Sequence, residues 1–189
     1  MLLVLLLTLS SNSNENSIIR IDKELMKQQV IINNKVIQNN QLHTLLLAVI
    51  KHESNGNNSI VGDNGKSVGI LQIQKCVIDD VNRIRHKYNK YTYTDRYDIN
   101  KSIQIFYDYQ SIYNKELDIE KAARIWNGGP NGMSKSKTNK YWLSVKSHLN
   151  NNKILKTIAS KINLTEDHDH LKFALNHDQN NQINANSSN

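Results

Sequence analysis

Apolar side chains recur at helical spacing just before the first cluster of glycines in the chain. Leu42, Leu46 and Val49 fall on one helical face, and Glu53 continues that face. The glycines at positions 56, 62 and 65 then interrupt the pattern, which predicts a helix end followed by a turn-rich segment. We therefore expect the Glu53 carboxyl group to lie on the buried side of a helix end.

A second carboxylate, Asp63, follows ten residues after Glu53 in a polar turn sequence, Gly62-Asp63-Asn64-Gly65-Lys66-Ser67. Burial should raise the pKa of Glu53, whereas the polar turn should leave Asp63 hydrated and ionised. Glycosidases use such a pair: one protonated carboxyl donates to the leaving oxygen and one ionised carboxyl assists at the sugar carbon. Taken alone, the pair has a simpler explanation, a helix-end carboxylate and an ordinary turn former.

Periodicity and helix start and stop signals predict further helices and a small β-region. The Gly-punctuated residues 59–73 are strand-like, and Gly128-Gly129-Pro130 stops a helix that begins near residue 118. The predicted helices run over about 18–31, from Asp98 or Asn100, over 118–126, from Thr138 or Asn139, and over 153–162. Together these elements predict an α+β fold that is mainly α.

Two sequence blocks carry a family resemblance. The stretch Ala123-Arg124-Ile125-Trp126-Asn127-Gly128-Gly129-Pro130-Asn131-Gly132, followed by Tyr141-Trp142 and Val145, resembles the C-terminal half of invertebrate-type (destabilase) lysozymes. Glu53-Ser54 and the stretch from Asp63 to Gln72-Ile73 resemble the active-site segment of that family. The same blocks also resemble soluble lytic transglycosylase (SLT) domains. The resemblance covers residues 40–149 and implies a lysozyme-like fold, with a cleft between a small β-region and the helices.

The resemblance implies a peptidoglycan-cleaving muramidase that acts on the β-1,4 bond between N-acetylmuramic acid and N-acetylglucosamine. By the same resemblance, Glu53 is the general acid and Asp63 the second catalytic carboxylate of a lysozyme. Lytic transglycosylases require no Asp at that position and use the Glu alone, which gives 1,6-anhydro products, so both mechanisms stay open. A non-catalytic glycan-binding module and a structural or nucleic-acid-binding basic protein are the alternatives from other functional classes.

The predicted substrate-binding residues lie inside or beside the matching blocks. Gln72 and Asn127 are flanked by apolar residues, where a polar side chain is expected to be buried for a purpose. Tyr107 falls where transglycosylases carry a substrate-side Tyr, although most of its helix face is expected to be core. The full set is Ser54, Gln72, Tyr107, Asn127 and Tyr141.

The chain departs from the disulfide-rich invertebrate-type lysozymes because it has one cysteine, Cys76, which cannot form an internal bridge. Cys76 lies among Val77, Ile78 and Val81, a pattern that predicts a buried apolar side chain. No metal or organic cofactor is expected. The sequence Asp167-His168-Asp169-His170 contains metal-binding residue types, but a hydrophilic tail without further ligands favours solvated side chains.

The formal net charge of +7 fits an anionic polymer such as a bacterial wall, and a generally solvated basic surface fits it as well. The basic residues are scattered, with no Lys/Arg block and no helix-turn-helix or RNA-binding signature, so we expect no nucleic-acid partner. The expected partner is peptidoglycan, and the protein is expected to be a monomer.

The chain begins with an apolar run of about nine residues, far below the ~20 needed to span a bilayer but typical of a signal-peptide core. We therefore expect a secreted protein without stable membrane insertion. The predicted organisation is a signal segment and Ser/Asn linker over 1–17, a catalytic domain over 18–150 with its core at 40–149, and an Asn-rich C-terminal extension over 151–189. The Asn/Gln/Ser-rich residues 10–40 and 150–189 are expected to be linker and tail.

Overall fold

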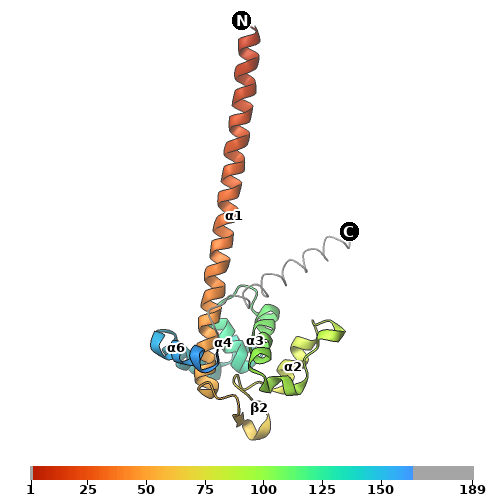
Figure 1. The fold of residues 1–189 in the computed structure, drawn as a ribbon, viewed down its shortest axis with the longest axis vertical. Helices are drawn as coiled ribbons and strands as arrows, with labels where there is room; N and C mark the ends of the chain where they lie inside the picture. Colours follow the sequence, from red (N-terminus) through yellow and green to blue (C-terminus); the bar gives the residue numbers. More distant parts are fainter. Residues whose placement is uncertain (1, 164–189) are drawn as a thin grey trace. The chain divides into compact units, whose positions relative to one another are not determined.

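The computed structural model describes the backbone of residues 2–163, and the side chains of residue 20 and of residues 23–163. Figure 1 shows the arrangement of the elements. The helices are α1 (Leu2–Ser54), α2 (Lys75–Asn82), α3 (Ile99–Tyr113), α4 (Ile119–Gly128), α5 (Ser136–Leu149) and α6 (Asn152–Lys161). The strands are β1 (Val61–Gly62) and β2 (Ser67–Val68), and the 3₁₀ turns are η1 (Asp63–Gly65), η2 (Lys87–Asn89), η3 (Tyr93–Tyr97) and η4 (Gly132–Ser134).

The chain divides into two compact units, Met1–Gln38 and Asn39–Asn189. Residues 10–40, expected to be linker, belong to the helix α1, which contains the helix predicted over about 18–31. No Gly or Pro occurs before Gly56, so nothing in this Asn/Gln/Ser-rich stretch breaks a helix. Within the part of the chain that the structure describes, no helix is long and apolar enough to cross a membrane.

In the second unit, the last turns of α1 form the centre of the core. Every residue from Leu45 to Ile50 is buried, so this helix segment is covered on all sides rather than on one apolar face. Ile103 and Phe106 of α3 and Ile125 of α4 are fully buried in the same apolar cluster. The side chain of Glu53 therefore projects from one of the most tightly enclosed elements of the unit.

The small β-region follows the end of α1. β1 and β2 are antiparallel, with Val61 opposite Val68, and Val68 forms a further bridge with Ile73. Gly69 turns the chain after β2 with a φ of 77°, and a Cβ atom there would lie 2.1 Å from the main-chain oxygen of Arg96. Only glycine fits this close approach. The observed elements confirm the predicted mainly α fold with a small β-region.

The helix boundaries confirm some local predictions and correct others. Asp98 caps α3 by accepting a hydrogen bond from the backbone N–H of Lys101, as its position before the apolar pattern predicted. α5 begins earlier than predicted: Thr138 lies inside the helix, where its hydroxyl contacts the carbonyl oxygens of Gly132 and Lys135 at 2.7 Å each. Cys76 is exposed, not buried, because it lies on the solvent side of the first turn of α2.

The predicted helix near the C-terminus is present as α6, which begins at Asn152. Asn151 caps it, and Leu155, Ile158 and the following Ile162 join the core cluster. The C-terminal extension predicted over 151–189 thus starts with a packed helix, while the exact domain boundaries stay predictions. The Asp167–His170 segment lies outside the described residues.

Candidate active site

Glu53 lies in the last turn of α1 with its side chain half-buried. The phenol hydroxyl of Tyr141, on α5, donates a hydrogen bond of 2.6 Å to Glu53 Oε1. Tyr141 is itself buried, so this hydrogen bond joins two helix faces inside the unit. The sequence placed Tyr141 among the substrate-binding residues, and the structure places it directly against the predicted general acid.

Burial raises the pKa of Glu53 from its ordinary value to about 7, because removal from water disfavours the charged carboxylate. The hydrogen bond from Tyr141 opposes this rise, since a phenol donor favours the ionised form. The negative charge of Asp63 adds to the rise. Glu53 can therefore hold a proton near neutral pH, as a general acid must.

Asp63 begins η1, immediately after β1, and its side chain is exposed. Its Oδ2 atom accepts a hydrogen bond of 2.5 Å from the Ser67 hydroxyl and one of 3.3 Å from Gln74 Nε2. Among the described residues no hydrogen bond joins the two carboxyl groups, and Asp63 affects Glu53 through its charge, which adds to the raised pKa. The pair recognised in the sequence thus has the two contrasting environments that the sequence predicted.

The chain reversal between the two carboxylates is held by Ser54. Asn55 and Gly56 take left-handed conformations after α1, with φ values of 53° and 74°. The buried Ser54 hydroxyl then donates a hydrogen bond of 2.7 Å to the carbonyl oxygen of Ile70 and accepts one of 3.1 Å from the Gly56 N–H. These bonds tie the residues after β2 to the helix end. Ser54, predicted to bind substrate, is engaged here with the protein backbone.

Gln72 is engaged in a similar way. Its side-chain amide donates hydrogen bonds to the carbonyl oxygens of Ile60, at 3.1 Å, and Gly69, at 2.9 Å. Its Oε1 atom occupies the space that a Cβ atom on Gly62 would need, only 2.5 Å away. The structure therefore places Gln72 within the β-region, where it fixes the loops that carry Asp63.

Tyr107 and Asn127 have no hydrogen bond to Glu53 or Asp63 among the described residues. The Tyr107 hydroxyl lies 3.1 Å from His43 Nδ1, and burial raises the pKa of this phenol well above its ordinary range. Asn127 occupies the last turn of α4 and is exposed, contrary to the burial expected from its apolar neighbours. The structure thus joins Glu53 to Tyr141 by a hydrogen bond, and Asp63 acts on Glu53 through its charge alone.

Sequence reasoning missed Arg96, which is 5% exposed in η3. Its guanidinium donates hydrogen bonds to the carbonyl oxygens of Tyr93, at 2.7 Å, Ile73, at 2.9 Å, and Lys66, at 3.2 Å. Arg96 thereby fastens the β-region to η3. No motif surrounds Arg96, and its carbonyl partners are all main-chain atoms, so the sequence contained no signal for it.

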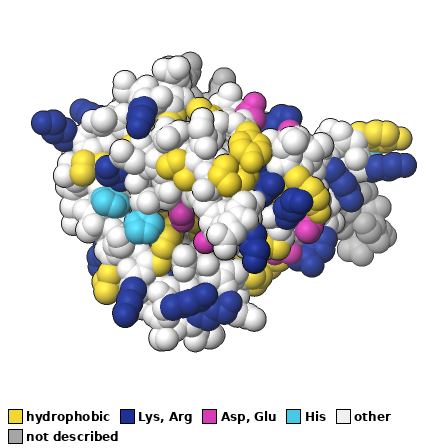
Figure 2. Space-filling model, turned by 90° about the horizontal axis from the view of Figure 1, so that it is seen from below, with side chains coloured by type: hydrophobic (Ala, Val, Ile, Leu, Met, Phe, Trp, Pro, Cys, Tyr) yellow, Lys and Arg dark blue, Asp and Glu magenta, His cyan; other side chains and the backbone are white. Residues whose placement is uncertain are grey.

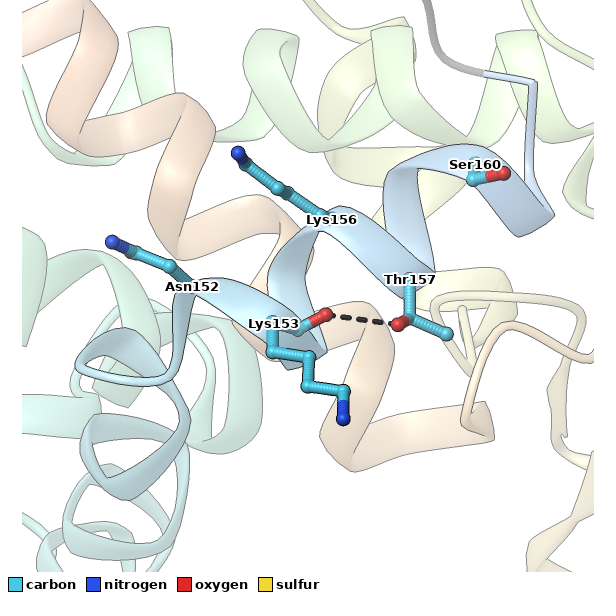
Figure 3. Close-up of a pocket in the computed structure, with 5 residues that line it drawn as sticks. All are labelled: Asn152, Lys153, Lys156, Thr157 and Ser160. Carbon is cyan, nitrogen blue, oxygen red and sulfur yellow. Dashed lines mark hydrogen bonds between the residues drawn. The ribbon is translucent and has the colours of Figure 1, made fainter.

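Two cavities lie on the second unit. One of about 340 Å³ lies next to Asp63, because its lining residue Gln74 bonds that carboxylate. The other, of about 600 Å³, lies on α6 (Figure 3), where Asn152 and Lys156 extend on one side of the helix and Lys153 on the other. No acidic residue lines the α6 cavity, so it offers no general acid. The first cavity is lined by Asn64, Gly65, Lys66, Gln74, Lys75 and Cys76, and the second also by Thr157 and Ser160.

On the face shown in Figure 2, histidine side chains lie beside acidic ones, and lysines and arginines are spread around them. His52, next to Glu53 in the sequence, contacts the Tyr141 ring with its own, at a centroid separation of 4.9 Å. Among the described residues, no group of three His, Cys, Asp or Glu side chains is placed to hold a metal ion. The chemistry available at the site is therefore that of two carboxyl groups, a phenol and imidazoles.

A half-buried acid at a helix end and an exposed carboxylate on a small β-region are the residue types that glycan-cleaving enzymes use. Residues 30–149 match the model of the transglycosylase SLT domain, and the chain belongs to that family. Its membership confirms the resemblance seen in the sequence blocks and implies cleavage of peptidoglycan glycan strands.

The structure is also similar to the crystal structure of Tapes japonica lysozyme, with a TM-score of 0.46 and 32% sequence identity. That match covers 55% of this chain and 86% of the lysozyme chain. Among curated proteins, none matches the chain significantly.

Proposed function

We propose that this protein cleaves the β-1,4 bond between N-acetylmuramic acid and N-acetylglucosamine in peptidoglycan, with Glu53 as general acid. The observation that carries the proposal is the half-buried carboxyl at the end of α1, whose pKa is raised to about 7 by burial. A carboxyl with this pKa is protonated in a large fraction of molecules at neutral pH and can donate to a leaving oxygen.

The hydrogen bond from Tyr141 defines which oxygen of Glu53 reacts. Tyr141 occupies Oε1 at 2.6 Å, and Oε2 has no hydrogen-bond partner among the described residues. Oε2 is therefore the atom that carries the proton to the glycosidic oxygen. As the bond breaks, the carboxylate that forms is stabilised by the phenol donor, because a hydrogen bond to the ionised form lowers its free energy.

Asp63 supports a hydrolytic mechanism. Ser67 and Gln74 hold its Oδ2 atom, which leaves Oδ1 without a partner in the described part of the chain. In this mechanism Asp63 acts as nucleophile or as ion-pair partner of the positive sugar carbon, and water completes the reaction with Glu53 as base. The charge of Asp63, which adds to the raised pKa of Glu53, supports this mechanism.

The family match favours a second candidate, lytic transglycosylation. Here Glu53 acts alone: it protonates the leaving oxygen and then takes a proton from the 6-hydroxyl of the sugar, which closes a 1,6-anhydro ring. Asp63 would then only shape the turn at η1. We favour hydrolysis because Asp63 is both hydrogen-bonded in a fixed orientation and electrostatically coupled to the acid.

Mass spectrometry of the muropeptides that the purified protein releases from peptidoglycan separates these mechanisms. Reducing ends support hydrolysis, and 1,6-anhydro ends support the transglycosylase. Wall binding without any released fragment would instead support a non-catalytic glycan-binding module. A DNA affinity that falls steeply with salt, together with no wall binding, would support a nucleic-acid-binding protein.

The proposed substrate also determines where the protein acts. Peptidoglycan lies outside the cytoplasmic membrane, so we propose secretion, in line with the apolar run at the start of the sequence. The net charge of +7 would attract the protein to an anionic wall, and this attraction should weaken as salt rises.

A further inference from the structure

The end of α1 contacts α5 through two neighbouring residues. Glu53 accepts the hydrogen bond from Tyr141, and His52 Nδ1 lies 3.1 Å from the Ser144 hydroxyl. Tyr141 and Ser144 are three residues apart on α5, so they lie on one face of that helix. The adjacent residues His52 and Glu53 of α1 thus contact Ser144 and Tyr141, which lie one helical turn apart on α5.

His52 also contacts the residue that its neighbour Glu53 binds. The His52 and Tyr141 rings meet edge to face, with an interplanar angle of 87° and centroids 4.9 Å apart. An edge-to-face contact restricts the tilt of a phenol ring, and the Ser144 hydrogen bond restricts the imidazole in turn. A series of contacts therefore runs from Ser144 to His52 and from His52 to Tyr141, whose hydroxyl bonds Oε1 of Glu53.

We propose that His52 is a positioning residue, which together with Ser144 holds the Tyr141 ring so that its hydroxyl stays on Glu53 Oε1. This inference rests on the proposed role of Glu53 as general acid. His52 itself transfers no proton and touches no substrate in this role. Its effect reaches the reaction through the orientation of Tyr141, which keeps Oε2 of Glu53 directed at the leaving oxygen.

The charges around His52 suit a neutral imidazole. Its ring contacts Tyr141 on α5, and the His148 ring of the same helix lies 6.3 Å away, while Lys51 and Glu53 are its neighbours in the sequence. Burial, and then the charge of His148, lower the pKa of His52 below its ordinary value. A neutral His52 places no cation beside Glu53, and a cation there would favour the ionised carboxylate over the acid.

Replacement of His52 by Ala, compared with replacement by Phe, tests the proposal. His52→Ala removes both contacts and should lower kcat on peptidoglycan about 10- to 100-fold, with KM changed less than about 2-fold, because small misplacements of catalytic groups are costly. His52→Phe keeps the ring contact with Tyr141 and should recover most of the lost kcat. Ser144→Ala should act in the same direction with a smaller effect, and it keeps the test valid if the His52 variants fold poorly.

The titration of Glu53 provides a readout that does not depend on turnover. In His52→Ala the hydrogen bond from Tyr141 weakens, so the pKa of Glu53 should rise above about 7, measured by carbon NMR of the labelled carboxyl group. The matched control is His86→Gln, because His86 is exposed like His52 and also packs on a tyrosine, Tyr88, at 5.5 Å, but has no contact with Glu53 among the described residues.

Two results would overturn the proposal. One is a wild-type kcat and an unchanged Glu53 titration in His52→Ala. The other is a lower melting temperature in that variant with an unchanged Glu53 titration, which is the result expected of a purely structural residue. If the wild-type protein releases no fragments but the Glu53 titration moves in His52→Ala and not in His86→Gln, the proposed function fails while the positioning role stands.

Discussion

The two carboxyl groups of the site lie in opposite surroundings. Glu53 projects from a helix whose preceding turns are buried on all sides, and Asp63 projects from an exposed 3₁₀ turn beside a two-stranded sheet. A core element withdraws water from the first carboxyl, and a polar loop leaves the second in contact with water. One small unit thus removes one carboxyl group from water, which raises its pKa, and leaves a second carboxyl group exposed.

The strongest test of this contrast removes the buried acid. Glu53→Gln should lower the rate of wall cleavage by a factor on the order of 10²–10⁴, because the amide has no proton to donate at the glycosidic oxygen. Turbidity clearing of a wall suspension measures the rate, and circular dichroism checks the fold. If the folded variant clears the suspension at nearly the wild-type rate, Glu53 is not the general acid.

The same variant should remove the contribution of Glu53 to the dependence of stability on pH. The pKa of Glu53 is higher in the folded protein, about 7, than its ordinary value of 4.5. Its stabilising contribution is therefore complete below pH 4.5 and is lost as pH rises through 7. Relative to wild type, Glu53→Gln should gain stability between these pH values, by at most about 3 kcal/mol. Denaturant unfolding at pH 4 and pH 8 measures the difference, and equal changes at both pH values would contradict the raised pKa.

Asp63→Asn tests the exposed partner. If the enzyme is a hydrolase, most activity should be lost, and the remaining products should still carry reducing ends. The loss of a negative charge should also lower the pKa of Glu53, so the alkaline limit of activity moves to lower pH. An active variant with 1,6-anhydro products would identify a transglycosylase and reduce Asp63 to a turn former.

Tyr141→Phe should shift the alkaline limit the other way. The variant keeps the ring but removes the hydrogen bond that favours ionised Glu53, so the pKa of Glu53 rises. We expect a loss of activity of about 10-fold, from less support for the carboxylate that forms during cleavage. A pH–rate profile compares the two variants, and shifts of Asp63→Asn and Tyr141→Phe in the same direction would contradict the assigned interactions.

Gln72→Ala and Asn127→Ala give the smallest expected effects. They distinguish a residue that stabilises the β-region from an exposed residue that could contact substrate. Gln72→Ala should destabilise the protein by about 1–2 kcal/mol, because it removes two side-chain hydrogen bonds to the carbonyl oxygens of Ile60 and Gly69, which then keep only their backbone N–H donors. Asn127 is exposed, so Asn127→Ala should change stability by less than about 0.5 kcal/mol and act only through KM. Thermal melts with parallel kinetics measure both. A Gln72→Ala variant with unchanged stability and a raised KM would show that Gln72 binds substrate.

Features that depend on local chemistry could be predicted from the sequence. Asp98 caps a helix, Gly129 ends one, and the Glu53–Asp63 pair follows from a helix pattern that stops at glycines. The role of Ser54 could not be predicted, because its partner Ile70 is brought near only by the fold of the intervening loop. The buried Arg96 was missed for the same reason.

Composition misled the sequence reading in two places. The Asn-rich residues 10–40 were expected to be linker, but amide side chains do not break a helix when Gly and Pro are absent. Cys76 was expected to be buried because of its apolar neighbours, but the helix face that points inward in α2 is that of Ile78 and Val81. Residue type alone therefore predicted neither the helical state of residues 10–40 nor the side of α2 on which Cys76 lies.

The hydrogen bond between Tyr141 and Glu53 joins residues 88 positions apart, whereas the reversal that brings Asp63 back towards Glu53 closes within 16 positions, from Ser54 to Ile70. Short loops close early in folding and long ones late. The two carboxyl groups should therefore come together before α5 docks, and a nascent or partly opened protein would hold a solvated, acid-incompetent Glu53. Catalytic competence then reports on the docking of α5, and because Tyr141, Trp142 and Val145 belong to the same apolar cluster as the end of α1, activity and the core should be lost together on heating.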